Sequence, residues 1–305
     1  MRKLLIRSVI AVVLLACAGR ARAIGWDSND FLIGGGPSFT NRIGVFDHDL
    51  TFKGYLDSNF VTVAGMDFDA AGNLVAVASA LRSVRVYASS GAIVGGFTRP
   101  DSLLGTPGDL KVAPSGNYIV ATQNFGGGDG ARQFIPDGAF VRQFGTGDIT
   151  GAAIVPGNRL WIGGIGIPDI HVYDLSTGLP VGTLATPHSA VSMTYSASTN
   201  SVLSCSAGRI HEIDLEGNVL RTFTAPGTSL SSATRGPNGD VFATDGIDES
   251  VVRWHADGQF VGSVSTGKVL GGAGEIVWAG NVPEPGAASA VIALTLGLSR
   301  RQRRT

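Results

Sequence analysis

The stretch FDAAGNLVAVA (68–78), followed by VRVYASSGAIVGGF (84–97), decides the fold, because its pattern returns four more times. A short strand leads to a turn with glycine or asparagine, and a strand of β-branched and aromatic residues follows. A third strand ends in a large residue, and a glycine turn leads to the fourth strand. The other copies begin with VAPSGNYIVAT (112–122), IVPGNRLWIGG (154–164), YSASTNSVLSC (195–205) and RGPNGDVFATD (235–245).

The repeat has a period near 40 residues. The large residue that ends the third strand recurs at intervals of 41, 47, 39, 40 and 41 residues, as Phe46, Tyr87, Phe134, Tyr173, Ile213 and Trp254. The one long interval contains an insertion around the glycine-rich stretch 126–130. A period near 40 with four strands per unit is typical of propeller blades.

The first copy lacks its first strand. Residues 31–36, 42–47 and 51–56 read as second, third and fourth strands, and GEIVWAG (274–280) supplies the missing strand from the far end. A unit that is apolar on both faces is stable only where neighbours cover it. We therefore predict an all-β fold, a six-bladed β-propeller over 24–281. Its blades are four-stranded, and the N- and C-terminal strands share one blade.

The units resemble NHL-type and related six-bladed propellers over roughly 31–281. Units such as FDAAGNLVAVA (68–78) carry this resemblance. It implies the fold and says little about function, because propellers host enzymes and binding modules alike.

The first 23 residues read as a secretory signal peptide. They combine a basic start, an apolar stretch at 9–18 and the small-x-small sequence Ala21-Arg22-Ala23. Signal peptidase would cleave after Ala23, so the mature chain would begin at Ile24. A competing interpretation is a lipoprotein signal, Leu14-Leu15-Ala16-Cys17, with Cys17 acylated.

Residues 282–305 combine three unlike elements in a fixed order: a Pro-Glu-Pro triplet, an apolar run at 286–299 and an arginine-rich end. The residues that define them are Pro283, Glu284, Pro285, Arg300, Arg301, Arg303 and Arg304. This order resembles the PEP-CTERM sorting signal of Gram-negative bacteria. The resemblance implies removal by an exosortase-type membrane protease and a cell-surface or extracellular location. A run of 14 residues falls short of the roughly 20 of a full transmembrane helix. We therefore expect only transient anchoring in the inner membrane.

The charge balance depends on these two ends. Nine of the 23 basic residues lie in them, so the middle of the chain is strongly acidic. An acidic exported domain is a poor partner for nucleic acid. Removal of the leader would leave Cys205 as the only cysteine, which excludes an intrachain disulfide and favours a buried thiol.

A metal site is one hypothesis for chemistry in the ring. Six-bladed propellers related to gluconolactonases hold a central metal with Glu, Asn and Asp, and the counterparts here are Glu275, Asn124 and Asp245. Hard oxygen ligands of this kind suit Ca²⁺. The favoured alternative is that Asp245 braces its loop. A further alternative is weak Ca²⁺ binding by the acidic loop that contains Asp245, Asp248 and Glu249.

Four polar side chains occupy the same register position on successive blades: Arg85, Arg132, His171 and His211. They either face a ligand or cap the seams between blades, and the second interpretation is favoured. The sequence shows no Gly-x-Ser-x-Gly elbow, no phosphate loop and no pair of histidines at metal spacing.

The leading hypothesis is an exported surface or extracellular-matrix protein that binds a polysaccharide or a protein without catalysis and without a resident cofactor. The alternative is a metal-dependent propeller hydrolase or lactonase. A third possibility is a structural spacer that binds no ligand.

Overall fold

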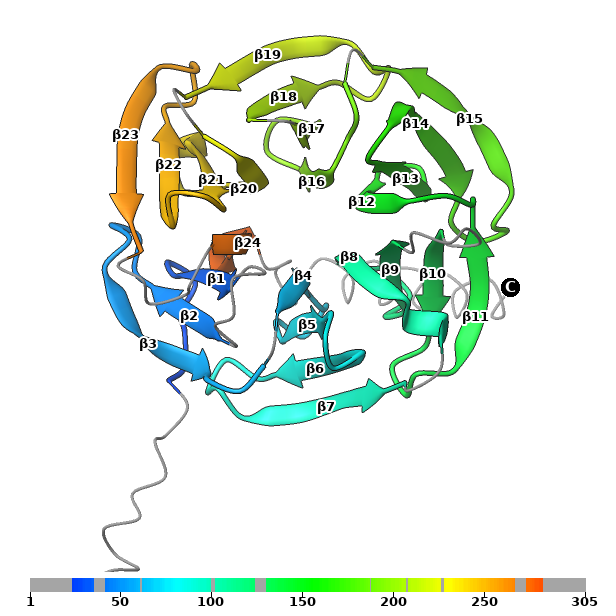
Figure 1. The fold of residues 1–305 in the computed structure, drawn as a ribbon, viewed down its shortest axis with the longest axis horizontal. Helices are drawn as coiled ribbons and strands as arrows, with labels where there is room; N and C mark the ends of the chain where they lie inside the picture. The colour runs from blue at the N-terminus through cyan, green and yellow to red at the C-terminus, as the bar shows by residue number, and fades with distance from the viewer. Residues whose placement is uncertain are drawn as a thin grey trace, which may run out of the picture.

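In the part of the chain that the computed structural model describes, 24 strands form six four-stranded antiparallel sheets (Figure 1). The structure describes residues 24–35, 42–60, 62–99, 102–123, 130–186, 188–206, 208–225, 228–266 and 273–281. The six sheets stand around a common centre as the blades of a propeller. The predicted all-β, six-bladed fold is therefore confirmed.

Each blade runs from an innermost first strand to an outermost fourth strand. Blade 1 contains β24 (Ala273–Trp278), β1 (Phe31–Gly35), β2 (Ile43–Phe46) and β3 (Phe52–Asp57). Blade 2 contains β4 (Val63–Phe68), β5 (Leu74–Ala78), β6 (Ser83–Tyr87) and β7 (Ile93–Thr98). Blade 3 contains β8 (Thr106–Val112), β9 (Tyr118–Gln123), β10 (Ala131–Phe134) and β11 (Phe140–Phe144).

The other three blades follow the same order. Blade 4 contains β12 (Ile149–Val155), β13 (Arg159–Gly164), β14 (Ile167–Asp174) and β15 (Pro180–Ala185). Blade 5 contains β16 (Ser192–Ser196), β17 (Ser201–Ser206), β18 (Arg209–Ile213) and β19 (Val219–Thr224). Blade 6 contains β20 (Leu230–Arg235), β21 (Val241–Asp245), β22 (Ser250–Trp254) and β23 (Phe260–Ser265). Three short 3-10 turns complete the elements: η1 (Ser102–Leu104), η2 (Pro237–Gly239) and η3 (Ala279–Asn281).

Blade 1 joins the two ends of the chain, as predicted. Strand β1 lies between β24 and β2, and Phe31 is opposite both Trp278 and Phe46. The closing strand ends at Trp278, whereas the sequence predicted strand through residue 280; residues 279–281 form η3 instead. Because β24 pairs with β1, strand β1 is not left as the open edge of a three-stranded sheet.

Turn chemistry explains the abundance of glycine and aspartate. In blades 2 to 6 the glycine before the fourth strand has a positive φ, for example 81° at Gly91 and 92° at Gly217, a conformation that glycine adopts without strain; in blade 1 Leu50 takes this place with φ 63°. In blade 5, Asp214 Oδ1 accepts hydrogen bonds from the backbone N–H groups of Glu216 and Asn218. Aspartate can make such turns because its short side chain reaches its own backbone.

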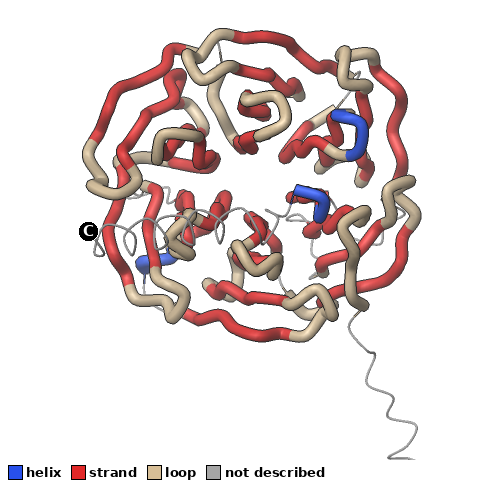
Figure 2. The backbone as a smooth tube through the Cα atoms, turned by 180° about the vertical axis from the view of Figure 1, so that it is seen from behind, coloured by secondary structure: helices blue, strands red, loops and turns tan. Residues whose placement is uncertain are grey.

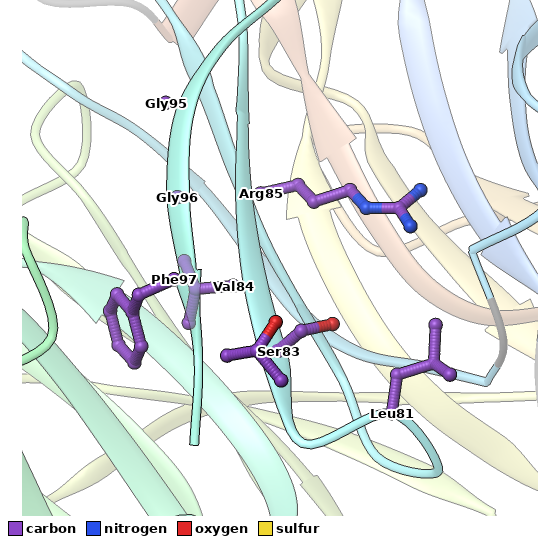
Figure 3. A pocket seen from close by; sticks show the side chains of 8 residues that line it. Leu81, Ser83, Val84, Arg85, Gly95, Gly96 and Phe97 are labelled. Atoms are coloured by element: carbon purple, nitrogen blue, oxygen red, sulfur yellow. The ribbon is translucent and has the colours of Figure 1, made fainter. Parts of the chain in front are cut away.

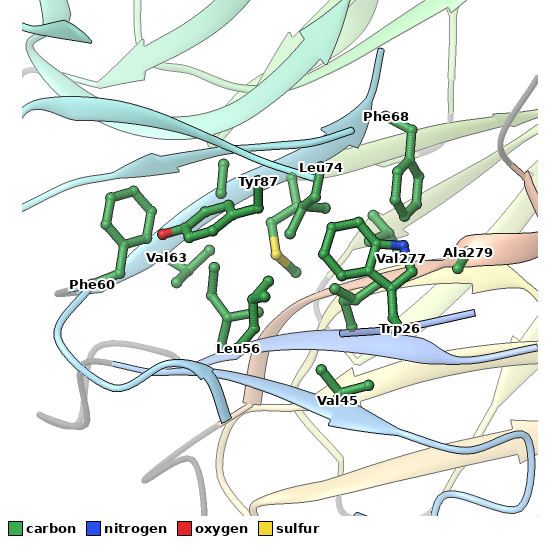
Figure 4. Packing of buried hydrophobic residues seen from close by; sticks show 14 of the residues in the cluster. Trp26, Val45, Leu56, Phe60, Val63, Phe68, Leu74, Tyr87, Val277 and Ala279 are labelled. Atoms are coloured by element: carbon green, nitrogen blue, oxygen red, sulfur yellow. The ribbon is translucent and has the colours of Figure 1, made fainter. Parts of the chain in front are cut away.

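The hydrophobic core is divided among the seams between blades. In the seam of blades 1 and 2, the buried side chains include Leu56, Phe60, Val63 and Tyr87, together with Trp26 from the segment before β1 (Figure 4). Each seam therefore buries the apolar faces of two sheets at once, as the repeat pattern predicted.

The antiparallel order sends both ends of the described chain to the same face of the ring. Turns between first and second strands, and between third and fourth strands, share one face; we call it the turn face. Segment 24–30 precedes a second strand and η3 follows a first strand, so both lie at the turn face. Figure 2 shows the ring from behind, with the loops that join its strands.

Replacing Ile276 by alanine tests the closing strand. Ile276 is 1% exposed and packs with Phe31 of blade 1 and Phe242 of blade 6. We expect Ile276→Ala to lower the free energy of unfolding by about 2–4 kcal/mol in urea denaturation, because a cavity opens where the ring closes. The control is Ile247→Ala, at a side chain that is 71% exposed. Equal unfolding midpoints for the two variants would contradict the predicted role of β24.

Candidate functional site

The innermost strands bring one lysine and three carboxylates together at the centre of the ring. They are Asp67 on β4, Asp109 and Lys111 on β8, and Glu275 on β24. The Lys111 ammonium donates to Asp109 Oδ1 at 2.7 Å, and both side chains are buried. Burial alone would lower the pKa of Lys111, but the carboxylates of Asp109, Glu275 and Asp67 raise it above its usual value.

These carboxylates are already engaged by other blades. Asp67 Oδ2 accepts from the N–H of Val112, and Asp109 Oδ2 accepts from the N–H of Ala152. Ser232 Oγ donates to Glu275 Oε1 at 2.7 Å. We call Asp67, Asp109, Lys111, Ser232 and Glu275 the inner polar cluster; its bonds connect blades 2 to 3, 3 to 4 and 6 to 1. The cluster satisfies buried polar groups across blades.

Glu275, one of the predicted metal ligands, is thus hydrogen-bonded to Ser232 of another blade. Burial, and then the neighbouring Asp109, raise the pKa of Glu275 to about 8, so the side chain is largely neutral at pH 7. A neutral carboxyl group is a weak ligand for a hard cation.

Asp245 braces its loop. It is buried at the end of β21, and its Oδ1 accepts from the backbone N–H groups of Ser229, Ile247 and Asp248. This is the favoured alternative from the sequence. Asn124, the third predicted ligand, lies outside the described residues. In the part of the chain that the structure describes, no three His, Cys, Asp or Glu side chains are grouped so as to hold a metal ion.

Three of the four same-register side chains contact the segment that enters from the preceding blade. Arg85 Nη1 donates to Asp57 at the end of β3, and Arg132 Nη1 donates to the carbonyl of Leu103, both at 2.6 Å. His211 stacks on His188, with ring centroids 4.0 Å apart. The interpretation that these side chains cap the seams is therefore confirmed for Arg85, Arg132 and His211. His171 is partly buried on β14, opposite Ile162 and Thr183.

The histidine pair was not predicted, because His188 lies in a connector far from His211 in sequence. His188 Nε2 lies 2.9 Å from Ser204 Oγ, and His211 Nδ1 lies 3.1 Å from Thr222 Oγ1. Burial, with a contribution from His211, lowers the pKa of His188 to about 4. Burial also lowers the pKa of His211, and the nearby charge of Arg209 adds to this. Both imidazoles are therefore neutral at pH 7.

The seam between blades 1 and 2 is hollow at the rim. A hollow of about 670 Å³ is lined by side chains from β3, including Lys53, Tyr55 and Asp57, and by Tyr87 and Ile93 of blade 2. A second hollow, of about 350 Å³, is lined mainly by β6 and β7 of blade 2 (Figure 3). We call the two together the seam hollows.

One carboxylate lies between the two hollows. Asp57 Oδ2 accepts from Arg85 Nη1 at 2.6 Å and from the Tyr87 hydroxyl at 2.7 Å, while Asp57 Oδ1 accepts from the N–H of Asn59. The Arg85 guanidinium lies over the Phe60 ring, 4.8 Å from its centroid. Burial, and then Asp57, raise the pKa of Tyr87. The sequence singled out Arg85 but missed Asp57 and Tyr87, because only the ring geometry brings two blades together.

Several sequence predictions concern residues outside the described part. They are the signal peptide at 1–23, the glycine-rich stretch at 126–129 and the sorting tail at 282–305. Within the described segments, no helix is long and apolar enough to cross a bilayer. Cys205 is buried and unpaired, as predicted, and burial raises its pKa, which makes the thiol unreactive.

Comparison with known proteins supports the fold and goes no further. No protein-family model matches the chain, and no curated protein sequence matches it. Among solved structures, a chain of a nidogen/laminin complex is similar, with a TM-score of 0.65 and 14% identity over 81% of this chain and 97% of that one. A protein of unknown function from Bacteroides caccae gives a TM-score of 0.63 and 13% identity over 81% and 97% of the two chains. Virginiamycin B lyase from Staphylococcus aureus gives 0.57 and 15% identity over 79% and 86%.

At these identities the likeness shows the propeller fold alone. The matched proteins include a chain from a protein–protein complex and an enzyme, so the neighbours do not select one activity.

Removing the central lysine tests the inner polar cluster. We expect Lys111→Met to lower the free energy of unfolding by about 3–5 kcal/mol, because it leaves buried carboxylates without their cation. Adding Asp109→Asn should recover part of the loss, since the amide oxygen can still accept from Ala152. The control is Arg159→Met, whose side chain and whose partner Asp174 are 37% and 28% exposed. Urea denaturation measures both, and an equal loss in the two single variants would contradict the role of the cluster.

The histidine pair predicts a pH dependence of stability. Because His188 has a pKa of about 4 in the folded chain and about 6.5 when unfolded, the unfolded chain takes up the proton first. We therefore expect stability to be full above pH 6.5 and to fall as the pH drops from 6.5 towards 4. Solvent reduces the effect, since His188 is only partly buried.

The variant His188→Gln should flatten this slope in urea denaturation between pH 4 and pH 7. The matched control is His48→Gln, at a side chain that is 61% exposed. The same slope in the parent and in His188→Gln would refute the assignment.

Proposed function

We propose that this chain is an exported, sorted surface or extracellular-matrix protein whose propeller binds a polysaccharide or protein partner without catalysis. The fold supports a binding or scaffold module, since a propeller presents rigid loops and seams around a fixed ring. The choice between a binding module and a metal-dependent hydrolase rests on which polar groups of the ring are hydrogen-bonded within the protein and which are open to a ligand.

One contrast carries the proposal. At the centre, where the alternative hypothesis puts a catalytic metal, Glu275 and Asp109 are buried and hydrogen-bonded to other blades. At the rim, the larger seam hollow is open and has a volume of about 670 Å³, within the roughly 300–1,000 Å³ of small-molecule sites. The open site of this ring is therefore a binding surface at a seam.

The placement of the two ends supports export and sorting. Segment 24–30 and η3 both lie at the turn face, and the Pro-Glu-Pro triplet begins two residues after Asn281. With almost no linker, the turn face would rest at the membrane until the tail is cut, while the seam hollows stay accessible at the side. After cleavage at Ala23, the new amino terminus at Ile24 would line the larger hollow.

Processing is tested on the protein expressed in a host that carries an exosortase. Fractionation followed by intact-mass analysis should give a mature chain that lacks residues 1–23 and the arginine-rich end. Changing Pro283 and Pro285 to alanine should leave the tail attached, because the recognition triplet is lost. The control is Gln302→Ala, within the tail but outside the motif. A mature parent chain that keeps all four terminal arginines would contradict the sorting proposal.

Metal analysis of the same preparation distinguishes the binding module from the metal-dependent hydrolase. We expect elemental analysis to find no stoichiometric Ca²⁺ or Zn²⁺ in the parent. Bound metal at one ion per chain that disappears in Glu275→Gln or Asp245→Asn would instead support the hydrolase alternative.

A further inference from the structure

A polar stripe runs along one face of β6. Ser83, Arg85 and Tyr87 are two residues apart, so their side chains project from the same face of the strand. Figure 3 shows Ser83 and Arg85 on one side of the β6–β7 pair and Phe97 on the other. Ser83 and Arg85 line the smaller seam hollow, and Tyr87 lines the larger one. The stripe spans about 13 Å, long enough to contact more than one unit of a linear ligand.

Ser83 has a hydroxyl group that the described chain leaves without a partner. Its Oγ is buried and has no hydrogen bond to any described residue, and the residue, which lines the smaller hollow, is 5% exposed. Buried hydroxyl groups in native proteins are nearly always bonded, so an exception calls for a partner from outside the chain. The neighbouring hollow is where such a partner would sit.

The smaller seam hollow is open because blade 2 has a glycine where other blades have a larger residue on the fourth strand. On blade 3, Gln143 is opposite Arg132 and bonds to it at 3.3 Å; on blade 5, Thr222 is opposite His211 and bonds to it at 3.1 Å. On blade 2 the residue opposite Arg85 is Gly96.

The backbone at Gly96 excludes any side chain. Its φ is +132°, and a Cβ atom would lie 2.2 Å from the carbonyl oxygen of Val84. Blade 2 therefore leaves space over Arg85 that blades 3 and 5 fill with side chains.

The charges around the seam hollows are balanced. Arg85 is paired with Asp57 at 2.6 Å, and Lys53 is paired with Asp30 at 2.6 Å and with Asp27 at 3.6 Å. Among the described side chains that line the hollows, each cation is therefore paired with a carboxylate. The pairs still offer hydrogen bonds, because a guanidinium has five N–H donors and the structure pairs only Nη1 of Arg85 with another described residue.

The larger hollow also offers apolar surface. Ile24, Tyr55 and Ile93 line it beside the polar groups of Asp57 and Tyr87. Donors, acceptors and apolar surface together match a ligand with hydroxyl groups at its edges and C–H groups on its faces.

We propose that the seam hollows of blades 1 and 2 bind a neutral, hydroxyl-rich saccharide chain. This inference rests on the proposed function of the propeller as a binding module. Sugar hydroxyls accept from Arg85, donate to Asp57, and supply the missing partner of Ser83. The C–H faces of the sugar pack on Ile93 and Tyr55.

Isothermal titration calorimetry of the mature protein tests this, with cello-, malto- and laminarihexaose as neutral probes and hexagalacturonate as the anionic probe. At least one neutral probe should bind, and hexagalacturonate should bind more weakly than that probe. The variant Ser83→Ala should weaken binding about fivefold to tenfold, equivalent to one hydrogen bond. It should not lower the urea midpoint, because Ser83 Oγ has no partner in the described chain to lose.

The matched control is Ser250→Ala. Ser250 occupies the same register position on blade 6 and is 6% exposed, so it matches Ser83 in position and burial but does not line the seam hollows. Its affinity should equal that of the parent.

Three results would overturn the inference: no binding of any neutral probe, preference for hexagalacturonate, or equal affinity in Ser83→Ala and the parent. The inference would also be overturned if the chain bound a protein with an affinity that Ser83→Ala leaves unchanged and bound no saccharide. Each of these would leave export and sorting untouched, since those are judged by the intact mass of the mature chain.

Discussion

The antiparallel pairing of β24 with β1 joins a strand from the end of the chain to one from its beginning, and the ring depends on this pairing. Each blade is apolar on both faces and is stable only between two neighbours, so an open ring would expose a whole sheet face on either side of the break. Closure gives blade 1 the same four strands as the others. It also sets Glu275 beside Ser232 of blade 6, so that the polar centre is complete only in the closed ring.

The centre and the rim of the ring use polar residues in opposite ways. The innermost strands converge so closely that a Cβ atom on Gly65 would lie 2.2 Å from the backbone nitrogen of Leu110. Polar groups there must bond to one another, and the inner polar cluster does this across blades. At the rim the blades diverge, and polar groups can remain open to a ligand. The physical consequence is that a propeller with a self-satisfied centre has its available sites at the seams and loops.

The seams are similar in design but unequal in detail. At the register position of Arg85, the side chains of Arg85, Arg132 and His211 contact the segment from the preceding blade although their types differ. The partner on the fourth strand differs: Gln143 and Thr222 fill the space on blades 3 and 5, and Gly96 leaves it empty on blade 2. A single small residue in an otherwise regular repeat thus distinguishes one seam from its neighbours. Segment 24–26 adds to this difference, since the N–H of Trp26 bonds to the carbonyl of Ser89 on blade 2.

The sequence by itself determined the fold. The alternation along each strand, the turn glycines and the 40-residue repeat are local signals that specify the strands and turns of every blade. It also determined the shared blade, since the first unit lacked one strand and the last segment supplied it. The tertiary structure alone decided how the site residues are used. Glu275 was a candidate metal ligand in the sequence, whereas in the structure it is buried and bonded to Ser232; Asp245 braces its loop through Oδ1, the interpretation that the sequence favoured. Asp57 and Ser83 carried no sequence signal, and Tyr87 was marked only as a large residue of the repeat, because the three lie on two strands, β3 and β6, of different blades. Their joint role depends on distances across a seam, and no repeat pattern along one chain encodes such distances.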